Sequence, residues 1–139
     1  MTARARTFSF DVSLDDEWAA HSALGGSTIS NEEEAWTPEH LVLAALCRCS
    51  LTSFRYHARR AGHEPTTHAS AHGVVTRREE DGRFAFVEIR IALNVAFPTS
   101  PPSEDVGELI MKGERDCFVG ASLTAKPEYH WTINVEDFS

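Results

Sequence analysis

One long helical segment constrains the fold of this chain more than any other feature. Its start is marked by Thr-Pro-Glu at residues 37–39. Threonine can cap a helix, proline at the first helical position needs no amide hydrogen, and an early glutamate suits the positive end of the helix dipole. Core-type residues then recur at three- and four-residue spacing until Gly62 provides a stop. Because apolar residues surround the first two-thirds on nearly every side, we predict a buried central helix over residues 37–61.

Alternating apolar residues predict strands on both sides of this helix. Residues 7–14 alternate as a half-buried strand, and residues 27–30 are a candidate partner for it. After the helix, the patterns predict further strands and two shorter helical segments: strands at 67–78, 84–97 and 129–135, with helical segments at 103–112 and 116–123. No repeat or linker interrupts the chain. We therefore predict one α+β domain over residues 1–139, with the long helix packed on an antiparallel sheet, and a homodimer that completes its small core.

The composition is that of a globular protein and limits its partners. Apolar residues make up 42% and charged residues 24% of the chain, which excludes a disordered tail, a collagen-like repeat and a coiled coil. The net charge of −8 disfavours nucleic acid and anionic membranes as partners, because phosphate-binding domains carry the opposite sign. The longest apolar run, residues 41–47, is far shorter than the roughly 20 residues that span a bilayer. With no apolar signal core near the N-terminus, we expect a cytoplasmic protein.

Three cysteines limit the chemistry of the chain. An odd number argues against a disulfide framework, and cytoplasmic cysteines are reduced at rest, so each is either a small buried residue or a reactive thiol. Cys49 lies on the predicted central helix, and Cys117 lies 68 residues later beside the second helix. The chemistry that needs two such thiols is peroxide reduction, in which one thiolate becomes a sulfenic acid and the other condenses with it to a disulfide.

Two cysteine motifs resemble those of a known family. Residues 37–49, TPEHLVLAALCRC, are similar to the start of the central helix in the OsmC/Ohr family of osmotically inducible and organic hydroperoxide resistance proteins. In that family a Pro-Glu-x-Leu pattern precedes the peroxidatic cysteine. Cys49 follows Glu39 at the family spacing, whereas Cys47 is two residues too early. Residues 117–123, CFVGASL, resemble the second cysteine motif, and the order of the predicted elements agrees over nearly the whole chain.

This resemblance implies an OsmC-like fold and a thiol-dependent peroxidase for organic hydroperoxides, with an antioxidant role in stress response. It also implies an intertwined homodimer with active sites at the subunit interface. Cys49 would be the peroxidatic thiolate and Cys117 the resolving thiol, while Glu39 would orient an arginine against the Cys49 sulfur. A dithiol such as a protein-bound lipoyl group would recycle the enzyme. No metal or organic cofactor is implied.

The sequence leaves the activating arginine open. The family takes this residue from its N-terminal strands, yet no arginine or lysine occurs between Thr7 and Cys47. Without a nearby cation, a cysteine inside an apolar helix stays largely a thiol at neutral pH. The candidates lie elsewhere in the chain: Arg4, Arg6, Arg48, Arg55 and Arg115.

Other functions compete with peroxide reduction. A catalytically weak relative would bind a small apolar molecule in the dimer cleft, and a thiol redox sensor would form a reversible Cys49–Cys117 disulfide with negligible turnover. A metal site at His63, His68 and His72 is disfavoured. Pro65 breaks the helix that a zinc-protease motif requires, and two residues four apart on a strand are about 13 Å apart.

Overall fold

The computed structural model of the chain describes residues 5–134 and 136–138. These residues form two compact units, which divide after Pro38. In the N-terminal unit, β1 (Val12–Leu14) pairs antiparallel with β2 (Ala20–Ser22). Asp15 closes the turn between them by accepting hydrogen bonds from two backbone amides, and Ile29 forms a single bridge to β2.

The prediction for the N-terminal strand is wrong in both its length and its partner. The sequence predicts a half-buried strand over residues 7–14, with residues 27–30 as a candidate partner, but only Val12–Leu14 form a strand and their partner is β2. Alternation marks a strand with one apolar face, but it does not say what covers that face. In this single chain the apolar residues of the predicted face are all exposed: Phe8, Phe10, Val12 and Leu14.

The predicted long helix is confirmed as α1 (Pro38–Arg60). The chain leaves it through Gly62, whose φ of +86° is the left-handed conformation in which helices commonly end. The expectation of burial on nearly every side is wrong, because α1 buries a single stripe and Leu41 on another side is exposed. No helix in the described part of the chain has an apolar stretch long enough to cross a membrane. The buried stripe consists of five residues: Leu46, Ser50, Ser53, Phe54 and Ala58.

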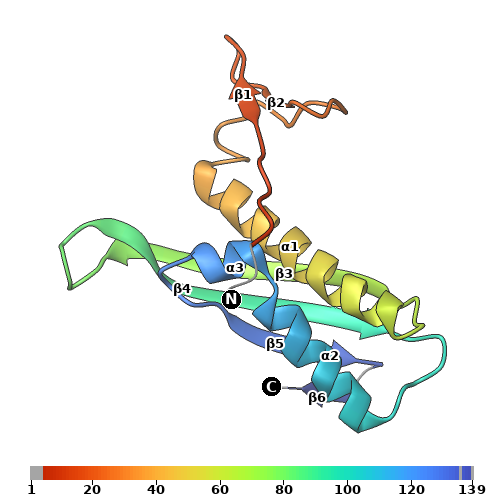
Figure 1. Ribbon diagram of the computed structural model, residues 1–139. Helices are drawn as coiled ribbons and strands as arrows, with labels where there is room; N and C mark the ends of the chain where they lie inside the picture. Colours follow the sequence, from red (N-terminus) through yellow and green to blue (C-terminus); the bar gives the residue numbers. More distant parts are fainter. Residues whose placement is uncertain (1–4, 135, 139) are drawn as a thin grey trace. The chain divides into compact units, whose positions relative to one another are not determined.

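A four-stranded sheet forms the second layer (Figure 1). Its spatial order is β3 (Thr66–Arg77), β4 (Phe84–Ala96), β5 (Glu128–Ile133) and β6 (Glu136–Phe138). β3 and β4 form a long antiparallel hairpin whose register shifts between Val74 and Val75. β6, which pairs antiparallel with β5, was not predicted; Val135, expected at the end of the last strand, lies outside the described residues.

The predicted α+β class, with a long helix packed on a sheet, is confirmed. One detail of that prediction is wrong: the sheet is not wholly antiparallel, because β4 and β5 run parallel. Between these strands the chain passes through α2 (Ser103–Arg115) and α3 (Phe118–Ser122). A parallel pair requires such a long crossover, and this one carries the chain back so that β5 starts beside the middle of β4.

Phe54 of α1 joins the helices to the sheet. Its ring centroid lies 4.9 Å from that of Trp131 on β5 and 6.2 Å from that of Phe97. Gly113 of α2 packs against the same residue, where an added Cβ would be 3.3 Å from the Phe54 Cα. α1 and α2 thus cover the same face of the sheet (Figure 1). This packing fixes the end of α2 and with it the short connection that leads to Cys117.

Candidate functional site

The two cysteines singled out by the sequence meet in the structure. Cys49 flanks the buried stripe of α1, and Cys117 is the residue that caps the N-terminus of α3. The two thiols are hydrogen-bonded to each other, and both are free rather than joined in a disulfide. The crossover between β4 and β5 therefore brings together two sulfur atoms that are 68 residues apart in the chain. This arrangement suits dithiol–disulfide chemistry.

Backbone amides at the start of α3 contact both sulfur atoms. The Val119 amide donates to the Cys49 Sγ at 3.5 Å, and the Phe118 amide also hydrogen-bonds to it. The Gly120 amide donates to the Cys117 Sγ at 3.4 Å. The first amides of a helix have no partner within that helix, so the sulfurs accept hydrogen bonds that would otherwise remain unmade. Such donors favour the thiolate form of a cysteine.

The two thiols differ in their access to solvent. Cys117 is 0% exposed, whereas Cys49 is only partly buried. An external molecule can therefore reach Cys49 directly, whereas Cys117 is closed to solvent in this chain. A thiol that reacts with an external molecule needs such access to solvent, whereas a thiol that reacts only with a neighbouring cysteine does not.

Burial raises the pKa of the Cys49 thiol above its ordinary value of 9.0. The amides of Val119 and Phe118 act in the opposite direction, while the neighbouring Cys117 raises the pKa further. No cationic side chain is among these main influences on the pKa. In the described part of one chain, Cys49 is therefore mainly a protonated thiol at neutral pH.

Two hydroxyl residues that the sequence analysis did not single out complete the surroundings of Cys117. The Ser50 Oγ lies 3.4 Å from the Cys117 Sγ, and the Tyr129 hydroxyl hydrogen-bonds to both Ser50 and Cys117. A serine in the apolar stripe of a helix is only a weak sequence signal for Ser50, because Ser53 lies in the same stripe and makes no such contact among the described residues. Tyr129 gives no such signal, since its inward position on β5 is equally that of a core aromatic residue.

Glu39 lies apart from the two sulfurs. It is exposed in the first turn of α1. Cys49 follows it by ten residues, so the two backbones are about 15 Å apart along a straight helix. Within the residues that the structure describes, Glu39 makes no ion pair.

The candidate arginines of the C-terminal unit are not among the main influences on the Cys49 thiol. Arg48 and Arg55 are exposed on α1, and Arg115 forks onto the carboxylate of Asp116 with two contacts of 2.9 Å. Arg6 belongs to the N-terminal unit, where its guanidinium lies 5.4 Å from the ring centroid of Phe8. Arg4 lies outside the described residues.

The residue before Cys117, Asp116, contacts two basic side chains. Besides the Arg115 fork, the Nε2 atom of His57 lies 2.7 Å from the Asp116 carboxylate. Arg115 and, to a lesser extent, His57 lower the pKa of Asp116 to about 2. Asp116 is therefore ionised at neutral pH, and its contacts link the end of α2 to α1 directly beside the thiol pair.

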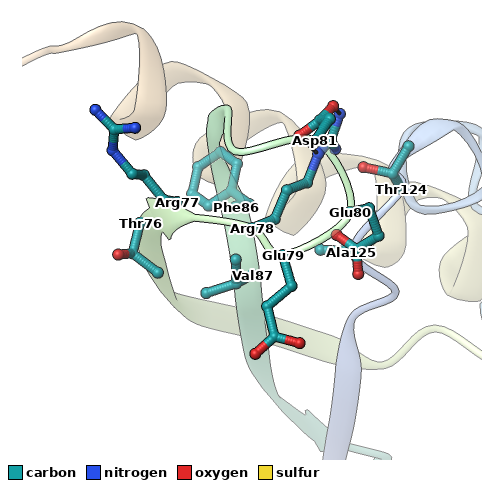
Figure 2. Close-up of a pocket in the computed structure, with 10 residues that line it drawn as sticks. All are labelled: Thr76, Arg77, Arg78, Glu79, Glu80, Asp81, Phe86, Val87, Thr124 and Ala125. Atoms are coloured by element: carbon teal, nitrogen blue, oxygen red, sulfur yellow. Dashed lines mark hydrogen bonds and ion pairs between the residues drawn. The ribbon is translucent and has the colours of Figure 1, made fainter.

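A surface hollow lies at the turn between β3 and β4 (Figure 2). Its walls come from the ends of these strands and from Thr124 and Ala125 beyond α3. Arg78 and Asp81 pair across the turn with a nitrogen–oxygen distance of 2.7 Å. Neither cysteine of the pair lines this hollow.

The histidines weighed as metal ligands are separated in the structure. His68 and His72 are exposed on β3, and the His63 ring packs edge-on against Phe97 with centroids 5.4 Å apart. Among the described residues, no three histidine, cysteine or acidic side chains are grouped closely enough to hold a metal ion.

The sequence matches the family described as OsmC-like protein over residues 30–132, most of the chain. No curated protein has significant sequence similarity to it. Among solved structures, an OsmC-like protein from Vibrio cholerae is 13% identical with a TM-score of 0.69, and the match covers 91% of this chain and 99% of that one. An OsmC-like protein from Mycoplasma pneumoniae is 15% identical with a TM-score of 0.65, covering 94% and 97% of the two chains.

A third similar structure has a functional name. The organic hydroperoxide resistance protein OhrB of Bacillus subtilis is 18% identical with a TM-score of 0.57, and the match covers 91% of this chain and 98% of OhrB. At such identities the likeness shows a common fold. It extends over nearly the full length of all three structures.

Proposed function

This chain belongs to the OsmC-like protein family, and on that basis we propose that it is a thiol-dependent peroxidase that reduces organic hydroperoxides. The observation that carries the proposal is the contact between the partly exposed Cys49 and the buried Cys117 at the start of α3. The OhrB relative, named for resistance to organic hydroperoxides, supports the choice of substrate class.

In the proposed reaction the Cys49 thiolate attacks one oxygen of the hydroperoxide. The O–O bond breaks, the alkoxide leaves and takes up a proton to become an alcohol, and Cys49 becomes a sulfenic acid. Cys117 then condenses with the sulfenic acid to give a Cys49–Cys117 disulfide and water. A dithiol, such as a protein-bound lipoyl group, reduces this disulfide by thiol–disulfide exchange. Sulfur supplies both electrons, so the reaction needs no metal or organic cofactor.

The side chains beside Cys49 favour an organic substrate. Phe118 and Val119, an aromatic and a branched aliphatic residue, adjoin the Cys49 sulfur through their backbone amides. Phe118 is 60% exposed, so a substrate that approaches Cys49 has apolar surface available. Burial of an alkyl or aryl group against such surface contributes roughly 25 cal/mol per Å². Hydrogen peroxide offers no such surface.

The proposal includes an intertwined homodimer, in which a second copy completes the site. Because the pKa of Cys49 is raised, the reaction requires a cation that stabilises the thiolate. That cation is not among the main contacts of Cys49 within the described part of one chain. Glu39 would orient that arginine, and the candidates remain those of the sequence analysis. The exposed apolar residues of the N-terminal unit provide surface for association.

The test is a coupled assay with cumene hydroperoxide and a dithiol such as dihydrolipoamide. We expect turnover by the wild type, none by Cys49→Ser and one slow or stalled cycle by Cys117→Ser. Cys47→Ser is the matched control, because Cys47 is also partly buried on α1 but lies two residues away. Equal rates for the wild type and Cys49→Ser would refute the proposal.

The raised pKa of Cys49 favours one alternative, a redox sensor that forms the Cys49–Cys117 disulfide slowly. In that case the disulfide appears on oxidation and disappears with dithiol, but hydroperoxide is not consumed catalytically. Turnover number, rather than the presence of a disulfide, separates the two functions.

A further inference from the structure

Three hydrogen-bonding groups from three different elements converge on the Cys117 sulfur. The Ser50 hydroxyl on α1 lies 3.4 Å from it, and the Tyr129 hydroxyl on β5 hydrogen-bonds to it as well as to Ser50. The Gly120 amide on α3 donates to the same sulfur at 3.4 Å. Cys49, by comparison, contacts amides of α3 and the Cys117 thiol, and no hydroxyl group is among its main contacts. The two thiols therefore have chemically different surroundings.

The hydroxyl pair is built into the core. Ser50 is 1% exposed, Cys117 is 0% exposed and Tyr129 is half-buried. The absence of a side chain at Gly120 leaves room for the Tyr129 hydroxyl, because a Cβ at that position would lie 2.6 Å from the Tyr129 oxygen. A buried polar group is costly unless it is hydrogen-bonded, so the close packing of both hydroxyls around one sulfur gives them a defined orientation.

The chemistry of the second step explains what such donors do. A thiol attacks another sulfur centre as the thiolate, and a buried thiolate is unfavourable unless donors stabilise its charge. The Tyr129 hydroxyl remains protonated, because burial and the adjacent Cys117 raise its pKa well above its usual range. It is therefore able to donate a hydrogen bond when the sulfur becomes a thiolate, and it does not compete as an anion.

We infer that Ser50 and Tyr129 are catalytic residues of the resolving step, in which their hydroxyl groups donate hydrogen bonds to the Cys117 thiolate as it attacks Cys49. The inference rests on the proposed function. In this step an electron pair of the Cys117 sulfur forms the S–S bond and the S–O bond of the Cys49 sulfenic acid breaks. The departing hydroxide combines with the proton given up by Cys117 to form water. The hydroperoxide of the preceding step is the oxidant.

The experiment separates the two steps in a single turnover. Reduced protein receives one equivalent of cumene hydroperoxide without dithiol, and samples are quenched with dimedone, which traps the sulfenic acid. We expect Tyr129→Phe and Ser50→Ala to consume hydroperoxide at the wild-type rate but to form the disulfide about tenfold more slowly, with sulfenic acid accumulating, since one hydrogen bond to a charged group is worth roughly that factor. The midpoint of the pH profile for disulfide formation should rise by about one unit.

Two matched controls exclude a general structural effect. Tyr56→Phe makes the same change at the other tyrosine of the chain, which is exposed on α1. Ser53→Ala makes the same change as Ser50→Ala in the same buried stripe, at a hydroxyl that has no hydrogen-bond partner within the described residues. Both controls should keep the wild-type rate and the wild-type pH profile of disulfide formation.

A second measurement decides the inference even if the peroxidase proposal fails. With Cys47→Ser and Cys49→Ser combined, Cys117 is the remaining thiol, and its pKa follows from thiolate absorbance against the same protein carrying Cys117→Ser. Tyr129→Phe and Ser50→Ala should each raise this pKa. No hydroperoxide turnover by the wild type would refute the proposed function alone. An unchanged Cys117 pKa together with unchanged disulfide formation in both variants would overturn the inference.

Discussion

Gly120 sets the space available at the thiol site. A Cβ added there would lie 2.6 Å from the Tyr129 hydroxyl oxygen and 3.3 Å from the Cys117 Sγ. Gly120→Ala should therefore displace Tyr129, slow disulfide formation and lower the free energy of unfolding by about 1–3 kcal/mol, the usual cost of overpacking. Denaturant unfolding and the single-turnover assay measure the two effects. Unchanged stability and rate would mean that the close approach is relieved without consequence.

The pH dependence of Cys49 alkylation shows whether a cation lies beside its sulfur. In a dissociated chain, burial keeps its pKa above 9.0, so the rate of its alkylation should still be rising as the pH passes that value. In the assembled protein proposed above, an adjacent arginine favours the thiolate and moves the midpoint to lower pH. Measuring alkylation of Cys49 over a range of pH, in a Cys47→Ser background and at several protein concentrations, checks both expectations. The same midpoint at every degree of association would contradict them.

At the scale of elements, we predict opposite effects on stability from replacing two glycines of α2. Gly113 lies at the crossing with α1, where a Cβ would already be 3.3 Å from the backbone of Phe54. Gly113→Leu should separate the helices and destabilise the protein by about 1–3 kcal/mol. Gly107→Ala meets open space on an exposed side of α2 and should stabilise by about 0.5–1 kcal/mol, because glycine is entropically unfavourable in a helix. Chemical denaturation of both variants gives the comparison. Equal effects would show that α2 does not pack on α1 as described.

The sequence predicts elements better where their signals are local. The ends of α1 agree with prediction to within a residue, because proline begins and glycine ends a helix for reasons contained in those residues. The direction of β5 depends on the path of the 31 residues between the strands, and no local pattern encodes that path. The meeting of Cys49 with Cys117 is likewise a product of the crossover. Ser50 and Tyr129 are recognisable as site residues only after that meeting is known.

At the scale of the whole molecule, the N-terminal unit exposes apolar side chains that a folded protein normally buries. Phe10 is 79% exposed and Val12 76%, although alternation of this kind normally buries one side of a strand. Phe10→Asp should therefore weaken self-association and, with it, peroxidase activity at low protein concentration. Leu24→Asp is the control, because Leu24 is also an exposed apolar residue of this unit but lies outside its strands. Sedimentation velocity over a dilution series measures the effect. A wild-type protein that remains monomeric at all concentrations would rule out the dimer.

The sulfur of Cys117 also serves as the cap of α3, where it accepts the Gly120 amide. A disulfide with Cys49 draws this sulfur toward α1, so oxidation weakens a hydrogen bond at the start of a helix of only five residues. The oxidised protein should therefore loosen this single turn, and amide hydrogen exchange at Gly120 should be faster than in the reduced protein. The exchange rate of this amide would thus report whether the neighbouring Cys49–Cys117 pair is oxidised or reduced.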